Sequence, residues 1–340
     1  MQQWLNRRWY DAEGSCSGLA PFAWLYGRAE RRRRARARPP SRLGAPVIVV
    51  GNLTTGGTGK TPLAVWIAAE LTRRALAVGL ISRGYGRAHS GVRVLTADSN
   101  WREVGDEPLI LHRRSGCVTA VARDRMAAAR AVLARGARVV VADDGLQHVA
   151  LARDCAIVVV DGARGFGNGR LLPAGPLREP LERLTAADAL VINGPPEHAS
   201  LRNAQHHFPP TVLRMDLRAG EARGVCCEQR RSLASFRGAP VHAVAGIGHP
   251  QRFFRELRER GLELIEHPCA DHRPLGAAEL DFGDALPVLM TEKDAVKCAH
   301  LDDRRLWFVP VEASFGQAET DQLIELLMRT IHSFASPPGG

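Results

Sequence analysis

The sequence predicts an α/β fold in which a parallel sheet carries helices on both faces, followed by a second, smaller α/β domain. Short apolar runs of strand length alternate with helix-like segments from residue 45 onward, a pattern typical of parallel sheets covered on both sides. A glycine-rich segment, GNLTTGGTGKT over residues 51–61, separates the first apolar run from the first helix-like segment. The α/β pattern restarts after about residue 210, which predicts the second domain.

The individual strands and helices follow from hydrophobic periodicity. In the first domain, expected at residues 45–234, strands are predicted at 47–50, 77–81, 138–142, 156–160 and 189–193, and helices at 62–75 and 126–135. In the second domain, expected at residues 235–340, strands are predicted at 241–245, 262–266, 287–291 and 307–310, and helices at 251–260 and 320–333. Residues 291–297 fit a capped helix start better than a binding site.

The segment at residues 51–61 has the features of a phosphate-binding loop, so the first sheet is expected to be P-loop NTPase-like. Glycines let backbone N–H groups surround phosphate oxygens, and the following helix adds the positive end of its dipole. Lys60 would reach the outer phosphates of ATP, and the Thr61 hydroxyl would bind Mg²⁺. Thr54 stands where the usual motif has glycine, so a glycine-rich turn with a chance Lys-Thr is the alternative. The expected nucleotide contacts are Thr55, Gly56, Gly57, Thr58, Gly59, Lys60 and Thr61.

Acidic residues are expected at the carboxyl ends of the strands, where α/β sheets bind ligands. Asp143 and Asp144 follow the strand at 138–142, so either could hold Mg²⁺ together with Thr61; a solvated turn is the alternative. Asp106 lies in a GDEP turn and is a candidate base for an attacking hydroxyl, although spacing alone makes it a loop acid. His272 follows Asp271 and could assist a base, but a lone histidine is more often structural.

Cationic and glycine-rich segments offer candidate substrate contacts. The segment SRGYGR over residues 82–87 presents cations, backbone amides and an aromatic face, which suit a phosphorylated sugar, and Arg123 could contribute another cation. Residues 165–176 form a long loop rich in glycine and proline, and such loops are often lids or binding walls.

The first 44 residues carry most of the net charge of +10, with ten arginines against three acidic residues. Aromatic groups beside a cationic run favour a helical segment that associates with an anionic membrane surface. A nucleic-acid-binding arm and a disordered basic tail are the alternatives. The aromatic residues of this segment include Trp4, Trp9, Phe22, Trp24 and Tyr26.

Composition narrows the class further. No stretch approaches the roughly 20 apolar residues of a membrane-spanning helix, and the seven cysteines have no C-x-x-C spacing. With no recognisable secretory signal, the cysteines are expected to be reduced, small and buried side chains in the cytoplasm.

Taken together, these segments resemble the tetraacyldisaccharide 4′-kinase family, the lipid A 4′-kinases of Gram-negative envelopes. The resemblance covers nearly the whole chain, and Thr54 is part of the family's form of the loop. It rests on these segments: Gly51–Pro62, Ser82–Gly86, Gly105–Pro108, Asp143–His148, Phe166–Pro176, Ala245–Phe254, Ala270–His272 and Met290–Cys298.

The resemblance implies that ATP donates its γ-phosphoryl group to the 4′-hydroxyl of a tetraacylated glucosamine disaccharide 1-phosphate. It implies catalytic roles for Lys60, for Asp106 as base and for His272 as its assistant. It also implies peripheral association with the cytoplasmic face of the inner membrane, with no nucleic acid and no obligate protein partner. The residues matched to the head group are Arg83, Tyr85 and Arg123.

Two other classes share the phosphate-binding loop. A switch-like ATPase, as in partitioning or metal-delivery proteins, would hydrolyse ATP slowly without a lipid acceptor. A nucleic-acid-dependent ATPase would use the arginine-rich arm, with steeply salt-dependent binding. The segments beyond the loop favour the kinase.

Overall fold

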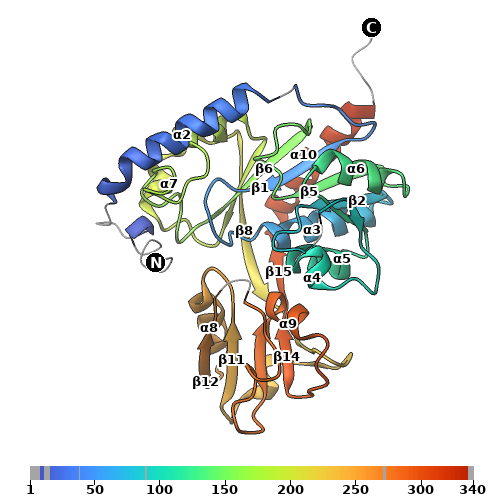
Figure 1. Ribbon diagram of the computed structural model, residues 1–340, viewed down its shortest axis with the longest axis vertical. Coiled ribbons are helices and arrows are strands. Elements are labelled where there is room, and N and C mark those ends of the chain that lie inside the picture. The colour runs from blue at the N-terminus through green and yellow to red at the C-terminus, as the bar shows by residue number, and fades with distance from the viewer. Residues whose placement is uncertain (1–7, 11–15, 38, 89, 271–272, 336–340) are drawn as a thin grey trace.

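The computed structural model describes residues 8–10, 16–37, 39–88, 90–270 and 273–335, which form two sheets joined by a pair of long-range connections (Figure 1). The larger sheet has nine strands in the order β15-β8-β7-β6-β1-β5-β2-β4-β3. Its strands are β1 (Val47–Gly51), β2 (Val78–Ser82), β3 (Arg93–Val94), β4 (Val118–Val121), β5 (Val139–Asp143), β6 (Cys155–Asp161), β7 (Ala189–Asn193), β8 (Thr211–Ala219) and β15 (Val311–Ser314).

The interior of the larger sheet is parallel, and only its edge strands β3 and β15 pair antiparallel to their neighbours. Strands β1, β5, β6 and β7 are buried along their whole length, because helices cover both faces. One face packs against α3 (Lys60–Arg73) and α10 (Gln317–Ala335). The other packs against α6 (Arg125–Leu133) and the loops that follow β6. The predicted α/β architecture is therefore confirmed.

The smaller sheet has six strands in the order β10-β9-β14-β13-β11-β12. In Figure 1 it lies below the larger sheet, with α8 (Pro250–Glu259) and α9 (Glu292–Cys298) packed on it. All four strands predicted for this region are present. The strands are β9 (Ala222–Gly224), β10 (Arg230–Arg231), β11 (Val241–Ala245), β12 (Leu264–Pro268), β13 (Val288–Thr291) and β14 (Leu306–Val309).

The predicted boundary between residues 234 and 235 does not follow the division between the sheets. Strands β9 and β10 precede it but belong to the smaller sheet, whereas β15 and α10 follow it but return to the larger one. The chain therefore crosses between the sheets after β8 and again before β15, and these two strands pair with each other. Periodicity marks strands but does not say which sheet a short strand joins.

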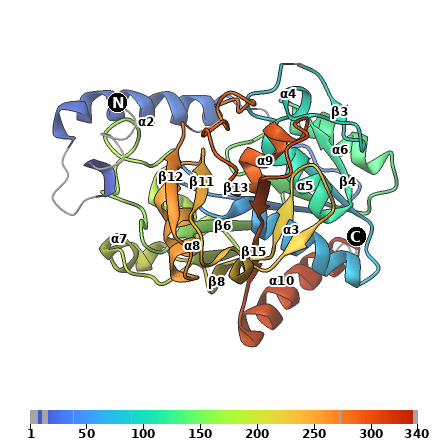
Figure 2. The same ribbon diagram turned by 90° about the horizontal axis from the view of Figure 1, so that it is seen from below.

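Two further helices pack against these sheets and their loops. Helix α5 (Asp106–Ser115) packs beside α9, and both views show the two helices side by side (Figures 1 and 2). Helix α2 (Ala20–Ala35) lies against the larger sheet's loops through Ala23 and Gly27, which are buried.

None of the helices in the described part of the chain combines the length and the apolar composition that a membrane span requires. All seven cysteines are free, and four of them are buried.

Candidate functional site

The loop between β1 and α3 has the backbone of a phosphate-binding loop. Gly56 and Gly59 adopt positive φ angles of 103° and 98°, which favour glycine. A Cβ atom at Gly59 would lie 2.8 Å from Nδ2 of Asn193. That Nδ2 atom donates a 2.9 Å hydrogen bond to the carbonyl of Thr58. Asn193, at the end of β7, therefore supports the loop from behind, and sequence reasoning had not singled it out.

The long loop after β6 closes the same region. The Thr55 backbone N–H donates to the carbonyl of Pro176 at 2.9 Å, and Thr54 forms a bridge with Leu177. The Tyr10 hydroxyl donates to the carbonyl of Thr55 at 3.3 Å. The predicted role of residues 165–176 as a binding wall fits this contact with the phosphate-binding loop.

Asp143 is the last residue of β5 and contacts the first turn of α3. Its Oδ2 atom accepts a 3.0 Å hydrogen bond from the Thr61 hydroxyl, and its side chain is almost fully buried. Burial and the neighbouring carboxylate of Glu107 raise the pKa of Asp143 to about 7. Its Oδ1 atom has no hydrogen-bond partner among the described residues. A buried, uncompensated carboxylate oxygen beside a threonine hydroxyl fits a hard cation such as Mg²⁺.

Asp144 has a different environment although it is the next residue. Its carboxylate lies 3.6 Å from Nζ of Lys60 and 3.2 Å from Nη1 of Arg178. Burial raises the pKa of Asp144, but Lys60 and Arg178 outweigh burial, so the net shift is downward. The two acids that the sequence left equivalent are thus distinct, since only Asp143 contacts Thr61. The described residues contain no cluster of three acidic, histidine or cysteine side chains suited to a metal, and Mg²⁺ in nucleotide sites commonly takes one or two carboxylates plus phosphates.

Asp106 begins helix α5 rather than lying within a loop, as its spacing had suggested. Its side chain is buried, and Oδ1 accepts a 2.9 Å hydrogen bond from the backbone N–H of Glu107. Gly105, before it, has a φ of 94° and packs against the backbone of Gly84. The acidic turn and the segment at 82–87 therefore meet. His272, the predicted assistant, lies outside the described residues.

Arginines surround a cavity of about 230 Å³ beside this turn. Arg83, Tyr85 and Arg123, the predicted head-group residues, all line it, and Arg87 joins them. Burial and the nearby Arg123 lower the pKa of Arg87, and one of its Nη atoms is buried with no hydrogen-bond partner among the described residues. Clustered, partly desolvated guanidinium groups are suited to an anion such as a phosphate ester.

Arg125 interacts electrostatically both with the acidic residues after β5 and with two arginines of this cavity. Its Nη2 atom lies 3.4 Å from the carbonyl of Asp144. Burial lowers the pKa of Arg125 to about 10, with the charge of Arg83 contributing in the same direction. The predicted metal residues Asp143 and Asp144 and the cavity arginines Arg83 and Arg87 therefore share Arg125 as a charged neighbour.

The smaller sheet reaches the phosphate-binding loop through the segment before α8. A Cβ atom on Gly248 would lie 3.7 Å from the backbone nitrogen of Gly57. Arg252 contacts Oδ2 of Asp161 at 3.2 Å and donates to Oδ1 of Asn193 at 3.0 Å. The second sheet thus supports the loop through Asn193, a long-range contact that no local pattern signals.

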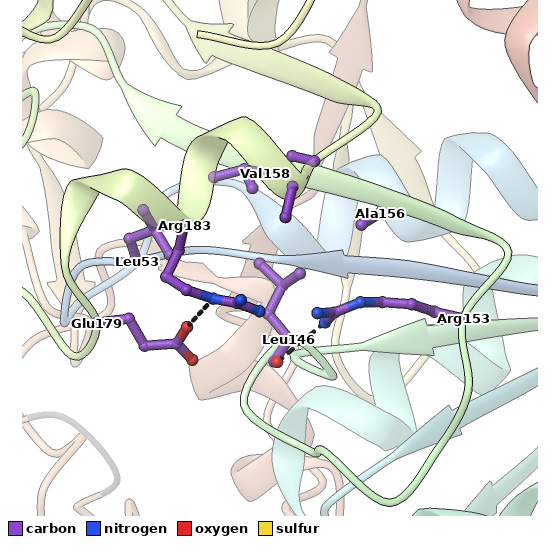
Figure 3. Close-up of a pocket in the computed structure, with 9 residues that line it drawn as sticks. Leu53, Leu146, Arg153, Ala156, Val158, Glu179 and Arg183 are labelled. Atoms are coloured by element: carbon purple, nitrogen blue, oxygen red, sulfur yellow. Dashed lines mark hydrogen bonds and ion pairs between the residues drawn. The ribbon is translucent and has the colours of Figure 1, made fainter. Parts of the chain in front are cut away.

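Helix α2 is connected to the site from the opposite side. The Tyr26 hydroxyl donates to the carbonyl of Arg178 at 3.1 Å, and Arg34 pairs with Glu179 at 2.5 Å. Glu179 also pairs with Arg183 beside a small cavity of about 10 Å³ (Figure 3). This cavity has room for a water molecule at most, so it is not the substrate site.

Comparisons with known proteins agree with this geometry. A family described as tetraacyldisaccharide-1-P 4′-kinase matches residues 16–331. Tetraacyldisaccharide 4′-kinase of Alkalilimnicola ehrlichii is 46% identical over 98% of both chains. That of Pseudomonas aeruginosa is 46% identical over 90% of this chain and 91% of its own.

A crystal structure of LpxK from Aquifex aeolicus in complex with ATP is similar with a TM-score of 0.74. It is 26% identical, and the match covers 93% of this chain and 99% of that one. The family match spans both sheets and, apart from Tyr10, every described residue of the candidate site. The chain belongs to the tetraacyldisaccharide-1-P 4′-kinase family.

Proposed function

We propose that the chain transfers the γ-phosphoryl group of ATP to the 4′-hydroxyl of tetraacyldisaccharide 1-phosphate, which makes the bis-phosphorylated precursor of lipid A. The observation that carries the proposal is the match to named 4′-kinases over 98% of the chain. The site geometry supports it, because a phosphate-binding loop, a metal-suited carboxylate and a cationic cavity adjoin one another.

The nucleotide is held by the backbone of residues 55–61 and by Lys60, whose ammonium group already faces Asp144. Thr61 and Asp143 would hold Mg²⁺, with Asp144 close by. When bound, Mg²⁺ neutralises charge on the phosphates and favours attack at the γ-phosphorus. Lys60 stabilises the charge that develops on the transferring group. Lys60 and Arg178 lower the pKa of Asp144 and keep it ionised, so the Asp144 carboxylate can hold Lys60 in place.

Asp106 accepts the proton of the attacking 4′-hydroxyl in this proposal. It lies in the first turn of α5, and Gly105 before it packs against Gly84, which lines the arginine-lined cavity. His272 would orient or assist this base. The cations of Arg83, Arg87 and Arg123, with the exposed ring of Tyr85, would receive the phosphorylated sugar.

Helix α2 would place the site on the cytoplasmic face of the inner membrane. Phe22, Trp24 and Leu25 expose 57%, 59% and 54% of their surface, while Ala23 and Gly27 face the protein. Exposed apolar side chains next to Arg28 and the arginines that follow suit an interfacial helix on anionic lipid. The proposal includes neither a nucleic acid nor an obligate protein partner.

Acceptor specificity tests the proposal. The protein is incubated with ATP, Mg²⁺ and tetraacyldisaccharide 1-phosphate in detergent micelles, and a second sample receives the same lipid with its 4′-hydroxyl blocked. We expect mass spectrometry to find one added phosphoryl group on the first lipid alone. Phosphorylation of both lipids would place the reaction at another hydroxyl. ATP hydrolysis without a phosphorylated lipid would favour a switch-like ATPase.

A further inference from the structure

Lys293 crosses from the smaller sheet to the acidic turn of the larger one. It belongs to the first turn of α9, and its Nζ atom lies 3.2 Å from Oε1 of Glu107 and 3.9 Å from Oδ2 of Asp106. The Lys293 side chain is 15% exposed and that of Asp106 is 5% exposed. Little water therefore screens the charges of Lys293 and Asp106. The Glu107 side chain is 39% exposed, so its nearer ion pair with Lys293 is partly screened.

A buried framework fixes the turn from which Lys293 projects. The Thr291 hydroxyl caps α9 and donates to Oδ2 of Asp294 at 2.6 Å. Oδ2 also accepts a 2.7 Å hydrogen bond from the Gly246 backbone, and Oδ1 pairs with Lys297 at 3.0 Å. Asp294 and Lys297 are both fully buried. The start of α9 is therefore held by the core of the smaller sheet, and Lys293 extends from a fixed base.

A second ion pair, separate from Lys293, also joins the two helices. At the other end of α5, Arg114 lies 3.3 Å from Glu292 on α9 and 3.0 Å from Glu312 on β15. It also donates to the carbonyl of Val311 at 2.7 Å. Of these contacts, the one with Glu292 reaches the smaller sheet, since β15 belongs to the larger one. The Arg114 side chain is 12% exposed, so a similarly shielded cation joins the same two helices.

The charge around the acidic turn explains what Lys293 adds. The carboxylates of Asp106 and Glu107 are adjacent, and Glu107 acts electrostatically on Asp143 in the nucleotide site. Carboxylates gathered this closely repel one another and would turn away from the cleft or take up protons. A cation placed against two of them offsets that repulsion and restricts their rotamers.

We propose that Lys293 is a positioning residue for phosphoryl transfer, which reaches over from α9 and holds the Asp106–Glu107 turn in its reactive orientation. The inference rests on the proposed function, because Asp106 is the base in that reaction. Through Lys293, the smaller sheet and its helices would take part in catalysis. This role is separate from the support that Arg252 gives to the phosphate-binding loop.

Three variants in the lipid phosphorylation assay test the inference: Lys293→Met, Lys293→Arg and, as the matched control, Arg114→Met. We expect Lys293→Met to lower kcat by about tenfold or more, because a small displacement of a catalytic group is costly. Its KM for ATP should stay within about twofold of the wild-type value, since Lys293 makes none of the described contacts to residues 55–61. Lys293→Arg should recover most of the lost kcat, because it restores the cation.

Arg114→Met should keep kcat within about twofold of wild type while lowering the melting temperature. If Lys293→Met does not fold, Lys293→Gln, which retains a hydrogen-bond donor without the charge, takes its place. An unchanged kcat in the folded variant, an equal loss in Arg114→Met, or no recovery in Lys293→Arg would overturn the inference. Failure of the wild-type protein to phosphorylate the lipid would instead overturn the proposed function, so the two failures are distinguishable.

Discussion

The Thr61 hydroxyl donates a 3.0 Å hydrogen bond to Oδ2 of Asp143 and so joins the first turn of α3 to the end of β5. This contact brings the phosphate-binding loop and the acidic strand end into one site. The other oxygen of Asp143 has no hydrogen-bond partner among the residues described. The buried carboxylate is therefore costly without a cation, and this cost should be measurable in the stability of the protein.

The first prediction concerns the pH dependence of that stability. The pKa of Asp143 in the folded protein is raised to about 7, above the value of about 4 in the unfolded chain. The folded state thus binds the proton of Asp143 more tightly than the unfolded chain does. The contribution of Asp143 to the free energy of unfolding is therefore fully present below about pH 4 and is lost as the pH rises through about 7. Without Mg²⁺, the melting temperature of the wild type should fall more between about pH 5 and pH 8 than that of Asp143→Asn.

Differential scanning fluorimetry at both pH values provides the measurement. Adding Mg²⁺ and ATP should raise the melting temperature of the wild type at the higher pH, because ligands that bind only the folded state stabilise it. If the melting temperatures of the wild type and of Asp143→Asn changed equally with pH, the titration of Asp143 would not be the cause of the pH dependence.

A second prediction concerns Asp106. Asp106→Asn keeps the size of the side chain but removes the proton acceptor, so kcat should fall by roughly a hundredfold or more. The KM for ATP should change little, because Asp106 lies on α5 and not on the phosphate-binding loop. Steady-state kinetics with the lipid acceptor measure both constants. Turnover close to the wild-type rate would remove Asp106 from the role of base.

A third prediction concerns the exposed face of α2. Replacing Phe22, Trp24 and Leu25 together by serine should weaken binding to vesicles that contain anionic phospholipid by roughly tenfold or more, because the apolar surface available for insertion is lost. Flotation of the protein with the vesicles measures binding. Ile265→Ser, at an exposed apolar position on β12, is the matched control and should bind normally. Equal flotation of all three proteins would exclude α2 as the membrane contact.

A fourth prediction concerns the buried pair between Asp294 and Lys297. Lys297→Met leaves the Asp294 carboxylate buried without its cation and should lower the free energy of unfolding by about 3–5 kcal/mol. Urea unfolding followed by circular dichroism measures the loss. The double variant that adds Asp294→Asn should recover part of it, because the uncompensated charge is then gone. A loss below about 1 kcal/mol in Lys297→Met would mean that the pair contributes no more than a surface ion pair.

Much of the larger sheet could be predicted because its central strands are buried on both faces and therefore read as continuous apolar runs. Strand β8 has no such run, because exposed residues alternate along it with buried or partly buried ones. This strand was therefore not predicted from the sequence. The short edge strands β3 and β10 carry too few residues for any period to be recognised.

The position of the glycine-rich loop between a strand and a helix could be predicted because the loop is contiguous in sequence. Arg178, Asn193, Arg252 and Lys293 were missed because they act through contacts between segments far apart in the chain. A single sequence has no local pattern that records such contacts, and only the crossing of the chain between the sheets brings them together.

The central claim is that Lys60 and the acidic strand end form a kinase site for a lipid hydroxyl. The most direct measurement is transfer of label from γ-³²P-ATP to purified tetraacyldisaccharide 1-phosphate, with wild type and Lys60→Ala compared side by side. We predict a labelled lipid with the wild type and a loss of at least about a hundredfold with Lys60→Ala, because Lys60 stabilises charge in the transition state. Folded wild-type protein that binds ATP but labels no lipid would contradict this claim.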